Sequence, residues 1–515
     1  MSDLQRILQS PRSMNRSHSK ASVRSASQTP LGYASDNSED VDEDDWNYGK
    51  IDDLIISKIA SLNDDDGESA SRNGSQVNLS DPLKFLKTHT IDEIITSLSL
   101  PRTQVSSASR ELLLAQMYHL IIKSPLPIDG VAVNERNTEL LVDFWKDARS
   151  ENERLFAFRC VVAYASSDID EVASVVISDF LPYVLNDLTP KDNEDGAVSV
   201  TLRSNYIIGY CALSLVAMDG SGCNGVEDIV TMLIDLAEGY DASSELNAED
   251  VASAALQGAG VLISLIFKGR STTRGLDELI QDVCPRVVVF LEAGHHIITQ
   301  KAAGKLVALM YELFDFQDDI EKDDNEDYGD EEELSPYFDV SEVLSLVKEL
   351  ATLSSKKVSK KEKKESHSLF RDVLRTVETH ASKTDRLAEQ NSLEEPSVLS
   401  HLKISKSKSL SITSWYSYLR LVHLRWIFSS GLHSQLANSS ESGIKDLIDF
   451  PEQSKYQFSR NIEEDSGIGE REFTTKSKAV NSKTRTKEIN SAREDKLRET
   501  LETLNVTDGD IVLSH

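Results

Sequence analysis

The chain has 515 residues, of which 39% are hydrophobic, and a formal net charge of −31. Residues 1–350 carry 28 basic and 62 acidic side chains, whereas residues 351–515 carry 27 basic and 24 acidic ones. Four cysteines form no CxxC pair and have no histidine at metal-ligand spacing, which excludes a zinc site and fits a reducing compartment.

A length of this order allows two to four domains. The charge pattern has two interpretations: an acidic front with a basic, RNA-capable rear, or acidic loops that simply solvate the chain. For the front we favour solvating loops. No apolar signal-peptide core follows Met1.

Residues 1–80 have the composition of a disordered region, first rich in serine and arginine and then acidic. Arg12, Arg16, Lys20 and Arg24 stand among serines, in Arg-x-x-Ser spacing that suits basophilic kinases. A transit peptide is the alternative, although an acidic run begins at Glu39. Residues 52–62 allow one short helix.

Residues 81–380 show helical periodicity nearly throughout, and their apolar segments align at a repeat of about 47 to 49 residues. This pattern predicts an all-α solenoid of the armadillo/HEAT type, whose helix pairs bury their apolar faces only by stacking. The predicted first helices are Arg154–Ala165, Arg203–Met218, Ser253–Phe267 and Lys301–Phe314, and the second helices are Ile169–Leu188, Val226–Glu238, Leu276–Leu291 and Val340–Leu353.

Glycines interrupt these helices at positions 209, 258, 260 and 304. Glycine inside a helix costs about 1 kcal/mol relative to alanine, so we expect close helix–helix approaches there. Val251–Phe267 is uncharged and near the lower length limit for a membrane span. Because similar apolar helices recur along the chain, we interpret it as a buried solenoid helix.

An acidic loop at residues 317–335 interrupts the last helical pair, with many carboxylates and a single lysine. One hypothesis is that it folds over the basic segment that follows and competes with RNA. The other, which we favour, is a merely solvated loop.

The basic segment that follows is the most distinctive stretch of the chain. A lysine strap precedes an amphipathic helix with apolar positions at Leu369, Phe370, Val373, Leu374 and Val377. Ser366 or Ser368 is the expected helix cap. The strap consists of Lys356, Lys357, Lys360, Lys361, Lys363 and Lys364.

Beyond the strap helix we expect a linker at residues 381–409, a small helical module at 410–452 and a basic flexible tail at 453–515. The module should dock on the end of the solenoid or fold on a partner. Its aromatic candidates for contact with RNA or ribosomal protein are Trp415 and Tyr416. The tail's candidate RNA contacts are Lys476, Lys478, Lys483, Arg485, Lys487 and Arg493.

No enzyme signature is present: the chain has no GxxxxGK[ST], GxSxG, HExxH or GxGxxG motif. His295 and His296 follow a glycine and open a helix, where a structural or capping role is expected. We therefore expect no catalytic residue, no metal, no cofactor and no small-molecule substrate.

The segment LATLSSKKVSKKEKKESHSLFRDVLRTVE, residues 350–378, resembles the signature of the interferon-related developmental regulator family. Its signature positions include Phe370, Arg371, Asp372, Leu374 and Val377. Two further blocks support the resemblance, which covers most of residues 81–498: the first runs through Leu410, Trp415, Gly431 and Asp449, and the second is Asn490-Ser491-Ala492-Arg493. The tail departs from animal relatives because acidic residues such as Glu494 and Glu499 interrupt it.

The resemblance implies a protein that occupies translationally idle ribosomes and represses translation. Lysines and arginines would neutralise rRNA phosphates, and Trp415 and Tyr416 would stack on bases or pack on ribosomal proteins. The alternative that it implies is a nuclear transcriptional coregulator, with corepressor proteins as partners and KKVSKKEKK as an import signal. We expect a monomeric protein in the cytoplasm, with the nucleus as a second location, and no membrane partner.

Overall fold

A computed structural model describes the stretches 90–123, 132–189, 198–220, 225–269, 274–316, 334–352, 360–391, 398–403, 409–437 and 444–449. Residues 1–89, nearly all of the acidic loop, Lys356 and Lys357 lie outside the described residues, as does the tail. All described residues belong to one compact unit, which extends to Phe450.

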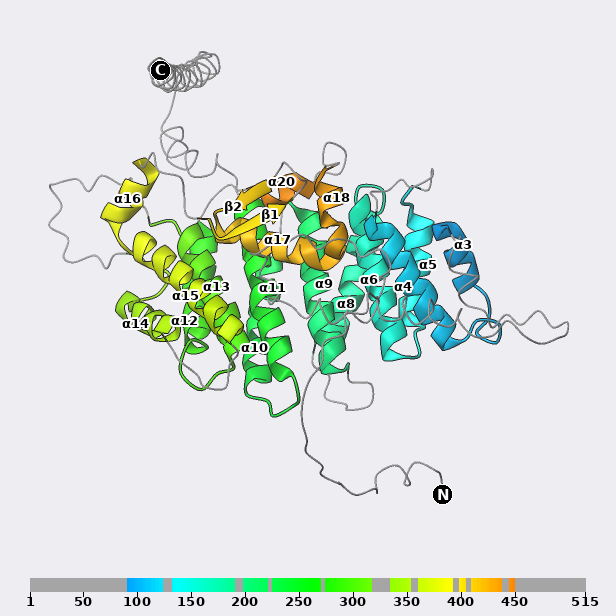
Figure 1. Ribbon diagram of the computed structural model, residues 1–515, viewed down its shortest axis with the longest axis horizontal. Helices are drawn as coiled ribbons and strands as arrows, with labels where there is room; N and C mark the ends of the chain where they lie inside the picture. Colours follow the sequence, from blue (N-terminus) through cyan, green and yellow to red (C-terminus); the bar gives the residue numbers. More distant parts are fainter. Residues whose placement is uncertain are drawn as a thin grey trace, which may run out of the picture. The chain divides into compact units, whose positions relative to one another are not determined.

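The structure is a stack of helices with one short hairpin (Figure 1). Six long helices form an inner row in which each packs on the next: α4 (Ser107–Lys123), α6 (Glu151–Ser167), α9 (Val200–Met218), α11 (Ala248–Gly269), α13 (Ile297–Leu313) and α15 (Lys360–Ala381). An outer set pairs with them: α3 (Ile91–Leu98), α5 (Glu135–Lys146), α7 (Ala173–Val175), the π-helix η2 (Val176–Phe180), α8 (Leu181–Leu188), α10 (Val226–Asp241), α12 (Arg274–Val289) and α14 (Val340–Thr352).

The predicted helices are therefore confirmed within a few residues at each end, and the all-α stacked architecture with them. The predicted pairing is shifted, because α10 packs chiefly on α11, α12 on α13 and α14 on α15, each the first helix of the next pair. Local caps fix several helix starts. Thr90 and Glu93 form a reciprocal capping box at α3, and Ser150 caps α6. His296 accepts a hydrogen bond from the Ile298 amide at the start of α13, which is the capping role expected for this histidine pair.

Helices α9 and α11 are long and apolar enough to cross a membrane by length and composition alone. Within the stack, 78% and 89% of their apolar windows are buried. Every residue of Val251–Phe267 is buried between neighbouring helices, which confirms the interpretation of this stretch as a solenoid helix. An apolar circumference is what a helix enclosed on all sides requires.

The helix glycines mark close helix–helix contacts, as predicted. A Cβ atom at Gly258 would lie 2.8 Å from Cys211 Sγ, and one at Gly260 would lie 2.7 Å from Leu419 Cδ1. At Gly304 it would lie 3.1 Å from Phe370 Cε1. The glycines thus allow α9, α11, α13 and their partners to approach more closely than alanine would permit.

Gly209 gives the sharpest test of this packing. A Cβ atom there would lie 2.7 Å from Phe158 Cζ and 2.8 Å from Trp426 Cη2, between two buried rings. We expect Gly209→Ala to lower the free energy of unfolding by about 1 to 3 kcal/mol through overpacking. Gly239→Ala is the matched control: it lies within α10 with nothing near its Cβ position, and should stabilise by about 0.5 to 1 kcal/mol. Urea denaturation measures both, and equal effects would contradict the packing argument.

The prediction of a linker at residues 381–409 is wrong, because part of this stretch forms regular secondary structure. It contains α16 (Lys383–Asn391) and the strand β1 (Ser400–Lys403), which pairs antiparallel with β2 (Ser409–Ile412). Leu402 and Ile412 point into the core and are 8% and 2% exposed. The hairpin was missed because its strands have only four residues each, too few for a clear alternating pattern.

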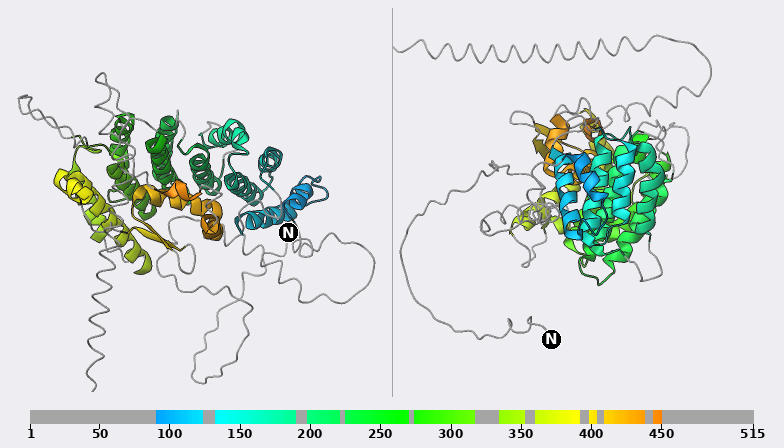
Figure 2. Two further views of the ribbon diagram at one scale, coloured as in Figure 1. Left: turned by 90° about the horizontal axis from the view of Figure 1, so that it is seen from above. Right: turned by 90° about the vertical axis from the view of Figure 1, so that its right-hand side faces the viewer.

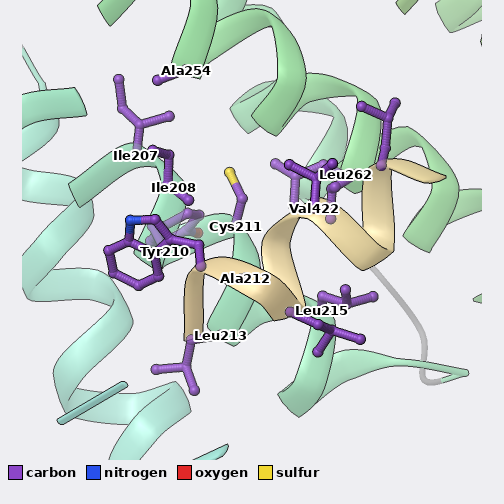
Figure 3. Close-up of a cluster of buried hydrophobic side chains, with 14 of the residues drawn as sticks. Ile207, Ile208, Tyr210, Cys211, Ala212, Leu213, Leu215, Ala254, Leu262 and Val422 are labelled. Atoms are coloured by element: carbon purple, nitrogen blue, oxygen red, sulfur yellow. The ribbon is translucent and has the colours of Figure 1, made fainter. Parts of the chain in front are cut away.

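The predicted small C-terminal module is also misplaced: it fills the middle of the stack instead of capping its end. After the hairpin come α17 (Trp415–Phe428), the 3₁₀ turn η3 (Ser429–Gly431), α18 (Leu432–Ala437) and α20 (Ile444–Ile448). Helix α17 packs against α6, α9, α11 and α13, and Figure 2 shows it running across them. In Figure 3, Val422 of α17 joins Leu262 of α11 and Cys211 of α9 in one apolar cluster.

Helix α15 begins earlier than the sequence pattern predicts. It starts at Lys360, so Lys360, Lys361, Lys363 and Lys364 occupy its first turns and do not lie in an extended strap. The expected cap at Ser366 or Ser368 is consequently wrong, since both lie inside the helix. As predicted, α15 is the last helix of the inner row, packed on α13 and α14.

Candidate functional site

Two features of the structure are candidates for function: the inner groove of the stack and the basic face of α15. The inner surface of an α-solenoid is commonly its binding surface. In this chain α17 occupies that surface, and nearly all of its residues are buried. The contacts that hold α17 therefore decide whether the groove is available to a partner.

Arg420 is the central anchor of α17, with a fully buried side chain. Its Nε donates to Ser264 Oγ at 2.9 Å, and its Nη2 donates to the Ser264 carbonyl oxygen at 2.8 Å. Its Nη1 lies 2.7 Å from Asp219 Oδ1 and donates to the Leu447 carbonyl oxygen at 3.1 Å. The guanidinium also stacks 4.0 Å from the Tyr416 ring centroid. One buried cation thus joins α9, α11, α17 and α20.

The first turn of α17 is fixed from the end of α13 and from α15. The Glu312 carboxylate accepts hydrogen bonds from the backbone amides of Trp415 at 2.7 Å and Tyr416 at 3.3 Å. A carboxylate at a helix N-terminus also interacts favourably with the helix dipole. The Trp415 indole donates to Thr376 Oγ1 of α15 at 2.8 Å. The basic helix α15 is thereby linked to the helix in the groove.

The last turns of α17 are fixed by the front of the stack. Trp426 Nε1 donates to Asn205 Oδ1 of α9 at 3.3 Å, and the Tyr118 hydroxyl of α4 donates to the Ile427 carbonyl oxygen at 2.9 Å. The buried Arg159 guanidinium lies 4.4 Å from the Trp426 ring centroid. Each helix of the inner row therefore supplies a polar or cation–π contact to α17.

This placement corrects the predicted role of Trp415 and Tyr416. Their side chains are only 2% and 0% exposed, so neither ring can stack on a base or lie against a ribosomal protein. Burial also raises the pKa of the Tyr416 hydroxyl. Their aromatic character serves packing, as in Trp415–Tyr418, with ring centroids 5.6 Å apart.

Another titratable group of α17, His423, is kept neutral by its surroundings. Burial lowers the pKa of its imidazole to about 4, and its Nδ1 lies 2.9 Å from the Leu419 carbonyl oxygen. In the described part of the chain, no group of three or more His, Cys, Asp and Glu residues is placed to hold a metal ion. Burial raises the thiol pKa of Cys160, Cys211 and Cys284, which suits structural roles.

The second candidate site is the basic face of α15. Phe370, Val373 and Val377 are fully buried and hold the helix against the stack. Of the other signature residues, Arg371 is exposed, while Asp372 and Leu374 are half-buried. The helix is thus rigidly attached by its apolar face, and its charged face is turned to solvent.

Helical spacing places four basic residues of α15 on one side. Lys360, Lys364, Arg371 and Arg375 fall within roughly 40° of the same direction at 3.6 residues per turn. Lys364 and the two arginines are exposed. Lys363 is half-buried and Lys361 lies in the first turn. At the far end of this stripe, Glu378 pairs with Lys348 of α14 at 3.1 Å.

The structure thus places two arginines beside the predicted lysines, and their i, i+4 spacing was already visible in the sequence. Lys356 and Lys357 precede α15 and lie outside the described residues. The same holds for the predicted tail contacts: Lys476, Lys478, Lys483, Arg485, Lys487 and Arg493. Their role stays a prediction.

Comparison with known proteins gives two matches. The family model described as "Interferon-related developmental regulator (IFRD)" matches residues 57–378, more than half of the chain. An uncharacterized protein of Schizosaccharomyces pombe is 24% identical over 311 residues. That alignment covers 59% of this chain and 62% of the relative, so the chain spans less than two thirds of the protein that it matches.

Proposed function

The chain belongs to the interferon-related developmental regulator family, and on that basis we propose that it is a non-enzymatic ribosome- and RNA-binding solenoid that represses translation on idle ribosomes. The proposed partners are rRNA and ribosomal proteins. The proposed location is the cytoplasm.

The observation that carries this proposal is the basic face of α15. Its exposed cations project from a helix that is anchored by Phe370, Val373 and Val377 at the end of the stack. Cations on a rigid element can match a fixed arrangement of phosphates, because little backbone freedom is lost on binding. The inner groove is the weaker candidate for the RNA-binding surface, because α17 already occupies it.

A second candidate function is that of a nuclear transcriptional coregulator that binds corepressor proteins. The cluster KKVSKKEKK, residues 356–364, favours it because dense lysines in an accessible segment suit an import signal. Import requires only positive charge, whereas a ribosome contact requires charge at a defined place on the solenoid.

Sedimentation of a cell lysate through sucrose, at low and then at high salt, separates the two functions. Co-migration with ribosomes that salt removes supports the ribosomal function, because phosphate contacts weaken steeply with salt. Recovery with chromatin or corepressor complexes, and absence from the ribosomal fractions, would support the coregulator function instead.

A further inference from the structure

A groove on the outer surface, between α5 and the segment α7–η2–α8, belongs to neither candidate site. It has a volume of about 590 Å³. Val142 and Val175 form a buried apolar floor, and Tyr183, which is 42% exposed, forms part of one wall. Apolar floors with polar walls are typical of binding grooves.

The walls of this groove are held in place. The Ser174 hydroxyl donates to Glu135 Oε1 at 2.7 Å and joins α7 to α5. The Trp145 ring lies 5.5 Å from that of Tyr183, and Lys146 Nζ lies 4.5 Å from the Tyr183 ring centroid. One wall includes the five-residue π-helix η2, a local conformation frequently found at functional sites.

The charge of the groove identifies the kind of occupant. Glu139, Asp143 and Asp179 line it with exposed carboxylates, against a single lysine that is engaged with the Tyr183 ring. Within the described stretches, none of the three carboxylates has an ion-pair partner. The occupant should therefore be basic.

One segment of this chain fits that requirement by sequence. Arg12, Arg16, Lys20 and Arg24 recur at every fourth residue, and Glu135, Glu139, Asp143 and Asp147 recur at the same interval along α5 and its C-cap. Residues four apart share one face of a helix, so α5 presents its carboxylates in one row. We propose that the N-terminal segment 12–24 docks in this outer groove of the same molecule.

The connecting chain permits this docking. Arg24 is 66 residues from Thr90, which caps α3, and α3 contacts α5. A chain of that length reaches up to about 200 Å when extended. Tethering also raises the effective concentration of the segment at the groove, so that weak surface ion pairs suffice. A phosphate on Ser19, in the Arg-x-x-Ser pattern, would be repelled by the carboxylates and would release the segment.

Limited trypsin digestion of the full chain tests the proposal, because a docked segment is protected from cleavage. The readout is the initial rate of cleavage after Lys20 and Arg24, followed by mass spectrometry at low salt. Glu139→Gln with Asp143→Asn should raise this rate about fivefold, the loss of two surface ion pairs. Asp170→Asn with Glu171→Gln is the matched control: these exposed carboxylates lie nearby but outside the groove, and cleavage should stay at the wild-type rate.

The reciprocal change closes a double-mutant cycle. Arg12→Gln with Arg16→Gln should also accelerate cleavage after Arg24, and combining it with the groove change should add nothing further. Additive effects, or equal rates in the wild type and the groove variant, would overturn the proposal. Protection that disappears on tenfold dilution would also overturn it, because the segment would then occupy the groove of a second copy.

Discussion

Replacing Arg420 with methionine is expected to lower the free energy of unfolding by about 3 to 5 kcal/mol, the usual cost of breaking a buried ion pair from one side. Methionine preserves much of the side-chain volume but removes every hydrogen bond of the guanidinium. Asp219, whose side chain is 11% exposed, then keeps its ion pair with Lys268, at 2.5 Å. The carbonyl oxygens of Ser264 and Leu447 are left without this donor. Denaturation in guanidinium chloride, followed by circular dichroism, measures the change.

Arg425→Met is the matched control on the same helix. It removes the same charge from a half-buried side chain that makes no hydrogen bond or ion pair with the described residues. Its effect should stay below about 1 kcal/mol. Adding Asp219→Asn to Arg420→Met should change stability by less than about 1 kcal/mol, because Asp219 still has its partly exposed ion pair with Lys268 once Arg420 is gone. Equal losses of stability in the two arginine variants would show that α17 does not depend on this anchor.

The repeat period and the positions of the stacked helices could be predicted from sequence because each helix carries its own apolar stripe. The position of α17 could not, since its partners lie far along the chain: Asp219 is 201 residues from Arg420. One signal was available. The stretch WYSYLRLVHLRWIF is apolar on all sides apart from one serine, two arginines and a histidine, which is typical of an enclosed helix.

In the candidate sites, too, some features could be predicted from the sequence and others could not. The buried face of α15 at Phe370, Val373 and Val377 follows from i, i+3 and i+4 spacing alone. The start of the helix at Lys360 was missed because the lysine-rich sequence was interpreted as a non-helical segment that precedes the helix. Lysine and glutamate are in fact good helix formers. The outer groove could not be predicted, because it is formed by side chains from two elements whose mutual placement the sequence does not specify.

Changing Lys356, Lys357, Lys360 and Lys361 to glutamate is expected to abolish most ribosome association. The change should leave the fold intact, because α15 is held by its apolar face and glutamates favour the first turn of a helix. For each phosphate that the variant no longer binds, the dependence of log K on log salt should flatten by roughly 0.7 to 0.9. Changing the same four lysines to arginine is the control, since it retains the charges and should retain binding.

A strong, unrelated import signal at the N-terminus of the four-glutamate variant separates import from ribosome binding. If the lysines act only in import, this signal restores nuclear function, and ribosome association was never impaired. If they bind rRNA, association stays abolished in every compartment.

The most direct measurement is co-sedimentation of the purified four-glutamate variant with purified ribosomes at physiological salt, beside the wild type and the four-arginine control. We expect the wild type and the arginine control to pellet with ribosomes while the glutamate variant stays in the supernatant. Full association of the glutamate variant would contradict the assignment of the ribosome contact to the start of α15.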